Sequence, residues 1–403
     1  MEGSCGGNRR RFLQTAAATG AALASADSLL AAPLAKSPVP LVKLGKTGQM
    51  VTKLGMGTSW DVAESLVQRY IAAGVRYIDT SESYENGNAE RAIGTVLERT
   101  GLRKDVYLVT KNNSYGNLKG SARAKSFLAH LQASMERLKT NYVDCYYMHG
   151  MRGRDIEVFK DPEAIKAFDD LKKSGKIRFA GFSCHDPMLA EVVEAAADAG
   201  WIDQMMIQYN FRTMDADKIK RAVDKASKAN LGIVAMKTQG GAEEFQPGEK
   251  VARINDLMDK GFKVHQAAIK AVFADDRVHA VVSEMTNFDQ LRENVGAAVN
   301  PLGPKEARLL EEHRTLTANR YCHGCGHLCE TAAKGVPVAT VLRYYRYYEA
   351  YGKREEARAL YQALPPESRA VAGLDLAGLD AACPHGLPVA DLVKAADRRL
   401  GLA

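Results

Sequence analysis

From Leu41 onward, short apolar runs of β-type residues alternate with longer stretches in which apolar positions recur at helical spacing. A two-strand opening, Leu41 to Lys53, is turned by Gly45 and Gly48. Helices are expected between the later runs, for example at Ala122–Leu138 and Asp161–Ser174. The runs predict eight strands, at Leu54–Gly57, Val75–Asp79, Val106–Lys111, Val143–His149, Arg178–Ser183, Met205–Tyr209, Ile233–Lys237 and His279–Ser283. Eight strand–helix units in this order predict an α/β fold, a (β/α)8 TIM barrel over residues 36–305.

The pattern changes after about Pro301, where no further strand-like run occurs and the remaining chain has helical periodicity. This region contains an internal repeat, since Gly335-Val336-Pro337-Val338-Ala339 recurs as Gly386-Leu387-Pro388-Val389-Ala390, and each copy leads into a helical segment. The sequence therefore predicts a small α-helical second domain at 315–403. Its clustered tyrosines could form a sugar-binding shelf, but their helical spacing favours packing against neighbouring helices: Tyr344, Tyr345, Tyr347, Tyr348 and Tyr351.

The N-terminal segment differs from the rest. Asn8-Arg9-Arg10-Arg11-Phe12-Leu13-Gln14 is similar to the twin-arginine export motif, an Ala-rich run follows, and Ala24-Ser25-Ala26 offers a cleavage site. We expect residues 1–35 to be a signal peptide and linker, and the folded protein to be exported by the twin-arginine translocase to the periplasm or another extracytoplasmic space. The alternative is a disordered basic tail. The run is too short and too polar for a membrane span.

Charge adds little to this picture. The formal net charge is +7, and Lys and Arg are interleaved with Asp and Glu along the chain. No basic stripe of the kind that binds nucleic acid is visible. With 46% hydrophobic and 26% charged residues, the composition is that of a soluble globular protein.

Four polar residues fall at or just beyond predicted strand ends. Asp79 closes the second strand, Lys111 the third and His149 the fourth, while Tyr84 lies in the loop after Asp79. The carboxyl ends of barrel strands are where this fold places its active sites. Over residues 41–300 the chain resembles the aldo-keto reductase family, in stretches that keep the family's order and spacing: Leu54-Gly55-Met56-Gly57-Thr58, Tyr77-Ile78-Asp79-Thr80-Ser81-Glu82-Ser83-Tyr84, Val109-Thr110-Lys111 and Asp144-Cys145-Tyr146-Tyr147-Met148-His149.

The resemblance implies an oxidoreductase that interconverts a carbonyl and an alcohol of a small molecule by hydride transfer. Tyr84 would be the general acid/base, although a free tyrosine has a pKa of about 10. The Lys111 ammonium is expected to lower that pKa, with Asp79 holding Lys111 in place and His149 orienting the substrate oxygen. Taken singly, each of the four has an ordinary structural interpretation. Trp60 and Tyr115 are the aromatic residues expected to face the substrate.

A nicotinamide dinucleotide, NAD or NADP, is also implied by the resemblance, with no glycine-rich Rossmann loop. The family positions that would bind it correspond to Gly57, Thr58, Asp79, Ser183, Met206, Met236, Lys237, Glu284, Gln290, Glu293 and Asn294.

Several of these positions depart from the family pattern. Cys184 replaces an asparagine, Met206 a glutamine and Gln290 an arginine, while Glu284 and Met285 replace a lysine and a serine that contact a 2′-phosphate. A carboxylate accepts hydrogen bonds from ribose hydroxyls and repels phosphate, which favours NAD over NADP. Alternatively, Glu284 caps a surface turn. The departures also leave open a non-catalytic barrel that binds a ligand or partner and keeps a vestigial cofactor site.

The cysteines of the C-terminal region resemble a reduced ferredoxin pattern. The run Cys322-His323-Gly324-Cys325-Gly326-His327-Leu328-Cys329 is followed much later by Cys383-Pro384. Ferredoxin runs read C-x2-C-x2-C-x3-C-P, and the fourth cysteine of one run ligates the cluster of the other. When the two halves are aligned on the internal repeat, one cluster has lost all its ligands, at Ala332, Gly373, Leu376 and Leu379.

The ligands of the other cluster remain as Cys322, Cys325, Cys383 and Cys329, the last displaced one place from Leu328. This pattern predicts one [4Fe–4S] cluster, similar to the ferredoxin-like tail of some aldo-keto reductases. The cluster would be structural or would exchange electrons with the cofactor or an electron-transfer partner. It could also replace the dinucleotide as the point where electrons enter.

Two alternatives stay open for these cysteines. One is a zinc site, either all-cysteine or with His323 or His327, and the other is a disulfide-bonded or metal-free remnant. Cys145 and Cys184, within or just after barrel strands, are expected to be packing residues.

Overall fold

The structure is a computed structural model that describes residues 37–59, 62–240, 263–318, 321–325, 328–369, 371–374 and 376–402. The predicted signal peptide and Trp60 lie outside the described residues.

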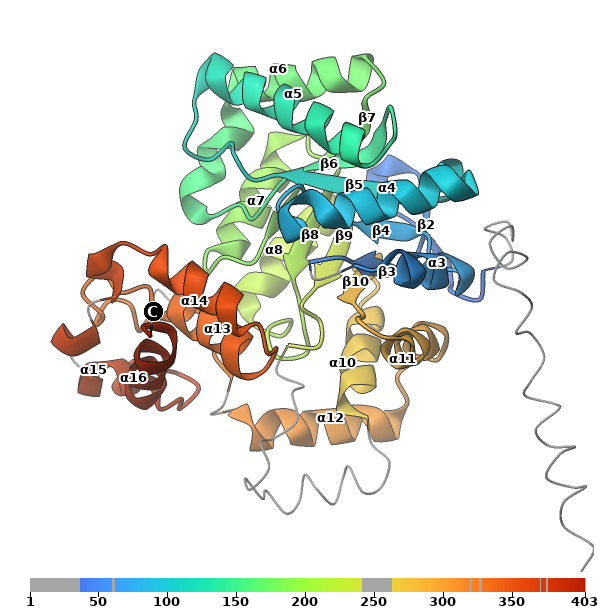
Figure 1. Ribbon diagram of the computed structural model, residues 1–403. Coiled ribbons are helices and arrows are strands. Elements are labelled where there is room, and N and C mark those ends of the chain that lie inside the picture. The colour runs from blue at the N-terminus through green and yellow to red at the C-terminus, as the bar shows by residue number, and fades with distance from the viewer. Residues whose placement is uncertain are drawn as a thin grey trace, which may run out of the picture.

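Eight parallel strands close into a barrel in the order β10-β3-β4-β5-β6-β7-β8-β9 (Figure 1). Each strand falls on one of the eight predicted runs, with ends that differ by at most two residues. The predicted (β/α)8 fold is therefore confirmed. The strands are β3 (Leu54–Gly57), β4 (Tyr77–Asp79), β5 (Tyr107–Asn112), β6 (Val143–Met148), β7 (Ile177–Cys184), β8 (Gln204–Gln208), β9 (Gly232–Met236) and β10 (Ala280–Glu284).

The predicted two-strand opening closes the amino end of the barrel. β1 (Leu41–Lys43) pairs antiparallel with β2 (Met50–Thr52). Leu44 and Val51 are buried in the same apolar cluster as the side chains of the barrel interior. At the turn, Gly45 has φ +46°, and a Cβ there would lie 2.6 Å from the carbonyl oxygen of Asn230. Only glycine fits this close approach.

Inside the barrel, four buried polar side chains form a hydrogen-bonded cluster. Tyr77, Tyr107 and Gln204 are the first residues of β4, β5 and β8, whereas Tyr147 lies near the carboxyl end of β6. Gln204 donates through Nε2 to the hydroxyls of Tyr77 and Tyr147, and its Oε1 accepts from Tyr107 at 2.6 Å. Because these buried polar groups are hydrogen-bonded to one another, we expect the cluster to serve stability. Cys145 packs in the same interior, and burial raises the pKa of its thiol well above the usual value.

Helices follow the strands and surround them. They are α3 (Glu64–Ala72), α4 (Asn88–Thr100), α5 (Gly120–Arg137), α6 (Pro162–Lys173), α7 (Leu189–Ala199), α8 (Asp217–Lys228), α10 (Val264–Phe273) and α11 (Phe288–Val299). The boundaries of α6 follow from local sequence. Asp161 caps its first turn by accepting from the Glu163 N–H, and Pro162 occupies the first helical position. The chain leaves the helix at Gly175, which has φ +72°.

The C-terminal region is helical, with α12 (Pro304–Leu316), α13 (Val338–Glu349), α14 (Arg354–Gln362), α15 (Leu376–Ala381) and α16 (Val389–Leu400). In Figure 1 the helices α13–α16 form a cluster beside the barrel, coloured orange to dark red. They bury an apolar core that is separate from the two clusters of the barrel strands and their covering helices. Tyr344 and Tyr348 belong to this core, as packing residues should, while Tyr347 and Tyr351 line a cavity beside it.

The internal repeat has a structural equivalent. α13 and α16 begin at matching positions, Val338 and Val389. A carboxylate from the preceding segment accepts the next backbone N–H in each: Glu330 from Ala339 at 3.1 Å and Asp380 from Ala390 at 2.8 Å. The repeated sequence thus specifies two similar helix starts. Within the described part of the chain, none of the helices has the length and apolar character needed to cross a membrane.

Candidate active site

The structure brings the four predicted catalytic residues together at the carboxyl end of the barrel. Lys111 donates through Nζ to Asp79 Oδ2 at 2.7 Å and lies 3.5 Å from the hydroxyl of Tyr84. The Tyr84 hydroxyl in turn lies 3.5 Å from His149 Nε2, and the two rings meet edge to face. Asp79 and Lys111 are almost fully buried. A substrate oxygen placed between Tyr84 and His149 could receive hydrogen bonds from both.

Tyr84 is held by an unusual turn. It begins the 3-10 turn η3 (Tyr84–Gly87), in which Glu85 and Asn86 adopt left-handed conformations with φ of 50° and 52°. The turn ends at Gly87, where a Cβ would lie 2.7 Å from Arg137 Cδ. Two successive non-glycine residues with positive φ are costly, and such strain concentrates at functional sites. The turn fixes Tyr84 above the ends of β4 and β5.

The predicted lowering of the Tyr84 pKa is wrong for this structure. Burial raises the pKa of Tyr84 well above 10, and the Asp79 charge raises it further. Lys111 does not reverse this, since its short contacts go to Asp79 and to the Thr80 carbonyl at 2.7 Å. Burial lowers the pKa of Lys111 and raises that of Asp79, while each partner's charge opposes the other's shift. Tyr84 is therefore a protonated phenol at neutral pH.

His149 is held as a neutral imidazole. Burial lowers its pKa well below 6.5, and the charges of Lys111 and Lys237 lower it further. Its Nδ1 lies 3.1 Å from the Ser81 hydroxyl. When Ser81 donates to Nδ1, the single ring proton is on Nε2, which faces Tyr84. Sequence reasoning missed Ser81, although it lies within the stretch that carries Asp79 and Tyr84.

The positions predicted to bind the nicotinamide ring are largely occupied by contacts within the protein. Ser183 is buried and accepts from the Gly150 N–H at 2.9 Å, and its own hydroxyl proton has no acceptor among the described residues. Met206 packs inside the barrel with Met236 at its edge. Thr58 donates to the Asp79 carbonyl at 2.9 Å. Of these, Ser183 keeps a donor for a carboxamide.

The positions predicted for the adenine side lie near β10 and α11. Glu284 Oε2 accepts from Ser59 at 2.7 Å, whereas its Oε1 is buried without a hydrogen-bond partner in the described chain. Asn294 donates to Ser283 at 3.0 Å, Gln290 accepts from the Thr286 N–H at 2.8 Å, and Glu293 pairs with Lys263. Gly57 pairs with the end of β10, and a Cβ placed on it would lie 3.1 Å from the Glu284 nitrogen. Of the four residues predicted for this side, Glu284 alone has a buried oxygen without a partner in the described part of the chain, and a ribose hydroxyl would be a suitable donor to it.

The C-terminal helices contribute side chains to the barrel mouth, which the sequence did not indicate. Tyr347 of α13 accepts from Lys237, just after β9, at 2.8 Å. Arg343 of the same helix donates to the His185 carbonyl, just after β7, at 3.0 Å. Lys353 lies 3.6 Å from the carboxylate of Glu284. The Tyr347 hydroxyl is close enough to Tyr84 to contribute to its raised pKa. Tyr115, expected to face the substrate, is instead buried against Phe127.

The four predicted cluster ligands, Cys322, Cys325, Cys329 and Cys383, line one small cavity of about 20 Å³. Burial is the main cause that raises the pKa of Cys322 to about 11 and that of Cys329 to about 12. All six cysteines described are free thiols, so no disulfide joins them. Among the described residues, no group of three or more His, Cys, Asp or Glu side chains is arranged to hold a metal ion. The donor set therefore fits a cluster in type and location, but the spacing does not.

Comparisons with known proteins agree with this geometry. The model of the aldo/keto reductase family matches residues 48–315. The chain is 24% identical over 299 residues to the uncharacterised oxidoreductase YqkF of Bacillus subtilis, covering 67% of this chain and 95% of that protein. It is 23% identical over 298 residues to L-galactose dehydrogenase of Arabidopsis thaliana, covering 68% and 93%.

A solved structure shares the fold. It is an aldo-keto reductase from Klebsiella pneumoniae in complex with NADPH, which superposes with a TM-score of 0.54 at 23% identity. The match covers 68% of this chain and 94% of that one.

Proposed function

The chain belongs to the aldo/keto reductase family, and we propose that it is an oxidoreductase that interconverts a carbonyl and an alcohol with a nicotinamide dinucleotide. The observation that carries the proposal is the assembly of Asp79, Lys111, Tyr84 and His149 within hydrogen-bond reach of one another at the carboxyl end of the barrel. The relatives named above include an oxidoreductase, a dehydrogenase and an NADPH complex, which support the same class of reaction.

In the direction of reduction, the protein's own groups supply and steer the proton. The protonated Tyr84 hydroxyl donates to the carbonyl oxygen as negative charge develops on it. His149 Nε2–H donates a second hydrogen bond to that oxygen and fixes its orientation. Lys111, anchored on Asp79, places a positive charge beside the phenolate that remains, and so stabilises Tyr84 after it has lost its proton. In oxidation the same groups act in reverse.

The dinucleotide, when bound, supplies or accepts the hydride. Ser183 would donate to its carboxamide, and Glu284 Oε1 would accept from a ribose hydroxyl. The Glu284 carboxylate favours NAD over NADP, because it would repel a 2′-phosphate.

Two experiments test the proposal together. Fluorescence titration with NADH and NADPH measures dinucleotide binding, and dinucleotide-dependent reduction of a panel of aldehydes and sugars measures turnover. Tyr84→Phe should lower the rate by about 10²–10⁴-fold while the thermal unfolding temperature stays the same. An active Tyr84→Phe enzyme would refute the role of Tyr84. If neither dinucleotide binds, the barrel is instead a ligand- or partner-binding protein with a vestigial cofactor site.

We propose a second role for the C-terminal region, a single [4Fe–4S] cluster on Cys322, Cys325, Cys329 and Cys383. Support comes from the single cavity that all four thiols line. Burial, and to a smaller extent the neighbouring thiols, raise the pKa of Cys322 and of Cys329, so that the thiolates a cluster needs would form only with a positive metal beside them. Iron and sulfide analysis of anaerobically purified protein, with its visible absorbance, tests the proposal. If the analysis finds zinc and no sulfide, the four cysteines hold a zinc ion and not an iron–sulfur cluster.

We further propose that the protein is exported through its twin-arginine motif. Substituting both Arg9 and Arg10 by lysine should leave the full-length protein in the cytoplasm, whereas the unaltered protein should be recovered from the extracytoplasmic fraction in a shortened form. If the variant and the unaltered protein are found in the same fractions in equal proportion, export by this route is refuted.

A further inference from the structure

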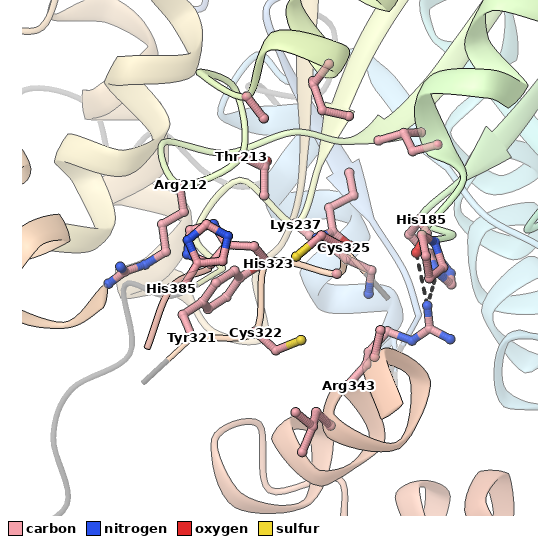
Figure 2. Close-up of a pocket in the computed structure, with 18 of the residues that line it drawn as sticks. His185, Arg212, Thr213, Lys237, Tyr321, Cys322, His323, Cys325, Arg343 and His385 are labelled. Carbon is pink, nitrogen blue, oxygen red and sulfur yellow. Dashed lines mark hydrogen bonds between the residues drawn. The ribbon is translucent and has the colours of Figure 1, made fainter. Parts of the chain in front are cut away.

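A second cavity lies where the C-terminal helices meet the barrel. It has a volume of about 500 Å³ and is bounded by the segments after β7, β8 and β9 on the barrel side, and by α13, the end of α12 and the segment Tyr321–Cys325 on the other. Figure 2 shows Lys237 and His185 on the barrel side and Arg343 on the ribbon of α13. A volume of this size accommodates a small metabolite. The residues predicted for the adenine side, on β10 and α11, do not line it.

The charged side chains that line this junction cavity are mostly basic. Two carboxylates also line it, but both already have partners: Asp215 pairs with Lys220, and Asp186 accepts the Gly153 and Met188 N–H groups. The basic residues that line the cavity are Arg212, Lys218, Lys237, Arg314, Arg343 and Arg346.

Two of these cations have only neutral partners. Arg343 donates through Nη1 to Nδ1 and to the carbonyl of His185, both at 3.0 Å, and its Nε is buried with no hydrogen-bond partner. Lys237 donates to the Tyr347 hydroxyl at 2.8 Å. Across the described ranges of the chain, no carboxylate lies within ion-pair distance of either cation. Partly buried positive charges without a counter-ion are costly.

Neighbouring groups respond to this positive field. Burial raises the pKa of Tyr347, but Lys237 and Arg343 together lower it more, so that it ends below 10. Burial lowers the pKa of His185 well below 6.5, with Arg343 and Lys237 adding to the shift. The cavity therefore provides a positive potential, which favours a bound anion, and the His185 imidazole beside it is neutral.

The cavity lies at the same end of the barrel as the proposed catalytic residues, although neither Tyr84 nor His149 lines it. His185, which does line it, directly follows β7, and His149 directly follows the neighbouring strand β6. An anionic group held between Lys237 and Arg343 could thus belong to a molecule that extends from the cavity toward His149 and Tyr84.

We propose that the junction cavity binds the carboxylate or phosphate group of an anionic carbonyl substrate, held by Lys237 from the barrel and Arg343 from α13. This assignment rests on the proposed oxidoreductase function and adds to it the charge of the substrate. It also gives the C-terminal helices a direct part in substrate binding.

Direct binding is measured on the full chain by calorimetric titration with inorganic phosphate, which does not depend on turnover. Removing one charged donor from a charge-assisted pair weakens binding by about 10- to 100-fold. Arg343→Met and Lys237→Met should each show this loss, while Arg343→Lys should keep part of the affinity. Arg398→Met, an exposed arginine of α16, is the matched control and should bind phosphate like the unaltered protein. Phosphate affinity that is the same in Arg343→Met and Arg398→Met would overturn the proposal.

Turnover then identifies the source of the anion. We compare kcat/KM for succinic semialdehyde, which carries a carboxylate, and for neutral butanal of the same chain length. The expected preference for the anionic aldehyde is about tenfold or more, and Arg343→Met should abolish it. If Arg343→Met weakens NADH binding instead and the two aldehydes react equally well, the anion belongs to the dinucleotide and the assignment to substrate is overturned. If neither aldehyde reacts but Arg343→Met and Lys237→Met both lose phosphate binding, the failure lies in the proposed reaction and not in the anion site.

Discussion

Lys111 lies 2.7 Å from Asp79 but 3.5 Å from Tyr84, so its shortest side-chain contact is with the carboxylate and not with the phenol. The buried ion pair positions the ammonium so that it can stabilise a Tyr84 phenolate only once that phenolate forms. Lys111 is thus organised for the charge that develops during reaction, and not for the resting state.

Lys111→Met should lower kcat/KM by about 100-fold or more, since the phenolate loses its compensating charge. It should also reduce the free energy of unfolding by about 3–5 kcal/mol, because Asp79 remains buried and unpaired. Urea unfolding and steady-state kinetics measure the two effects. The double variant Lys111→Met with Asp79→Asn should recover stability without recovering activity. Recovery of both would show that Lys111 is only structural.

Titration of Tyr84 or His149 should not change kcat/KM for reduction between about pH 6 and pH 9. The reason is that the pKa of Tyr84 lies above this range and that of His149 below it, both mainly because of burial. Measuring kcat/KM for reduction across the range at constant ionic strength checks this. An acidic limb near pH 6.5 that disappears in His149→Asn would contradict it.

Glu284 should set the preference between the two dinucleotides. Glu284→Gln keeps an acceptor for Ser59 but removes the negative charge, so binding of NADPH relative to NADH should improve by about tenfold. Fluorescence titration with both dinucleotides gives the ratio. Glu356→Gln is the control, because Glu356 is a further carboxylate beside Lys353, at 3.8 Å. An equal change in both variants would assign the effect to Lys353.

The polar cluster inside the barrel should contribute to stability and not to turnover. Gln204→Leu leaves the hydroxyls of Tyr77, Tyr107 and Tyr147 without their shared partner, which should cost about 3 kcal/mol or more. Tyr107→Phe should cost less in the Gln204→Leu background than alone, because its acceptor has already gone. Denaturant unfolding of the four proteins completes the cycle, and additive effects would argue against a cooperative cluster.

His279 should make the protein less stable in acid. Burial lowers its pKa below 6.5, and its Nδ1 accepts from the Ile233 N–H at 3.0 Å, which requires the unprotonated nitrogen. The unfolded chain therefore binds a proton more readily than the folded one, so stability is lost as pH falls below about 6.5 and is unaffected above it. In His279→Asn, which keeps an acceptor, unfolding free energy should fall less steeply on acidification. An unchanged slope would exclude His279 as a contributor.

Much of the barrel could be predicted from the sequence because its signals are local. Each parallel strand is a short apolar run buried on both faces, so the eight runs give the strand order directly. The fold's rule that chemistry takes place at the carboxyl ends then brought Asp79, Lys111 and His149 to one place. The repeated Gly-x-Pro-Val-Ala segment likewise indicated the two helix starts at Val338 and Val389.

The tertiary structure decided what depends on distance and on burial. The sequence suggested that Lys111 lowers the pKa of Tyr84, but burial dominates and raises it. It could not show that α13 reaches the barrel mouth, because the contacts of Arg343 with His185 and of Tyr347 with Lys237 join residues more than a hundred positions apart. The sequence alone thus determined which residues end the strands, while packing of the C-terminal helices decided the charge and shape of the space above them.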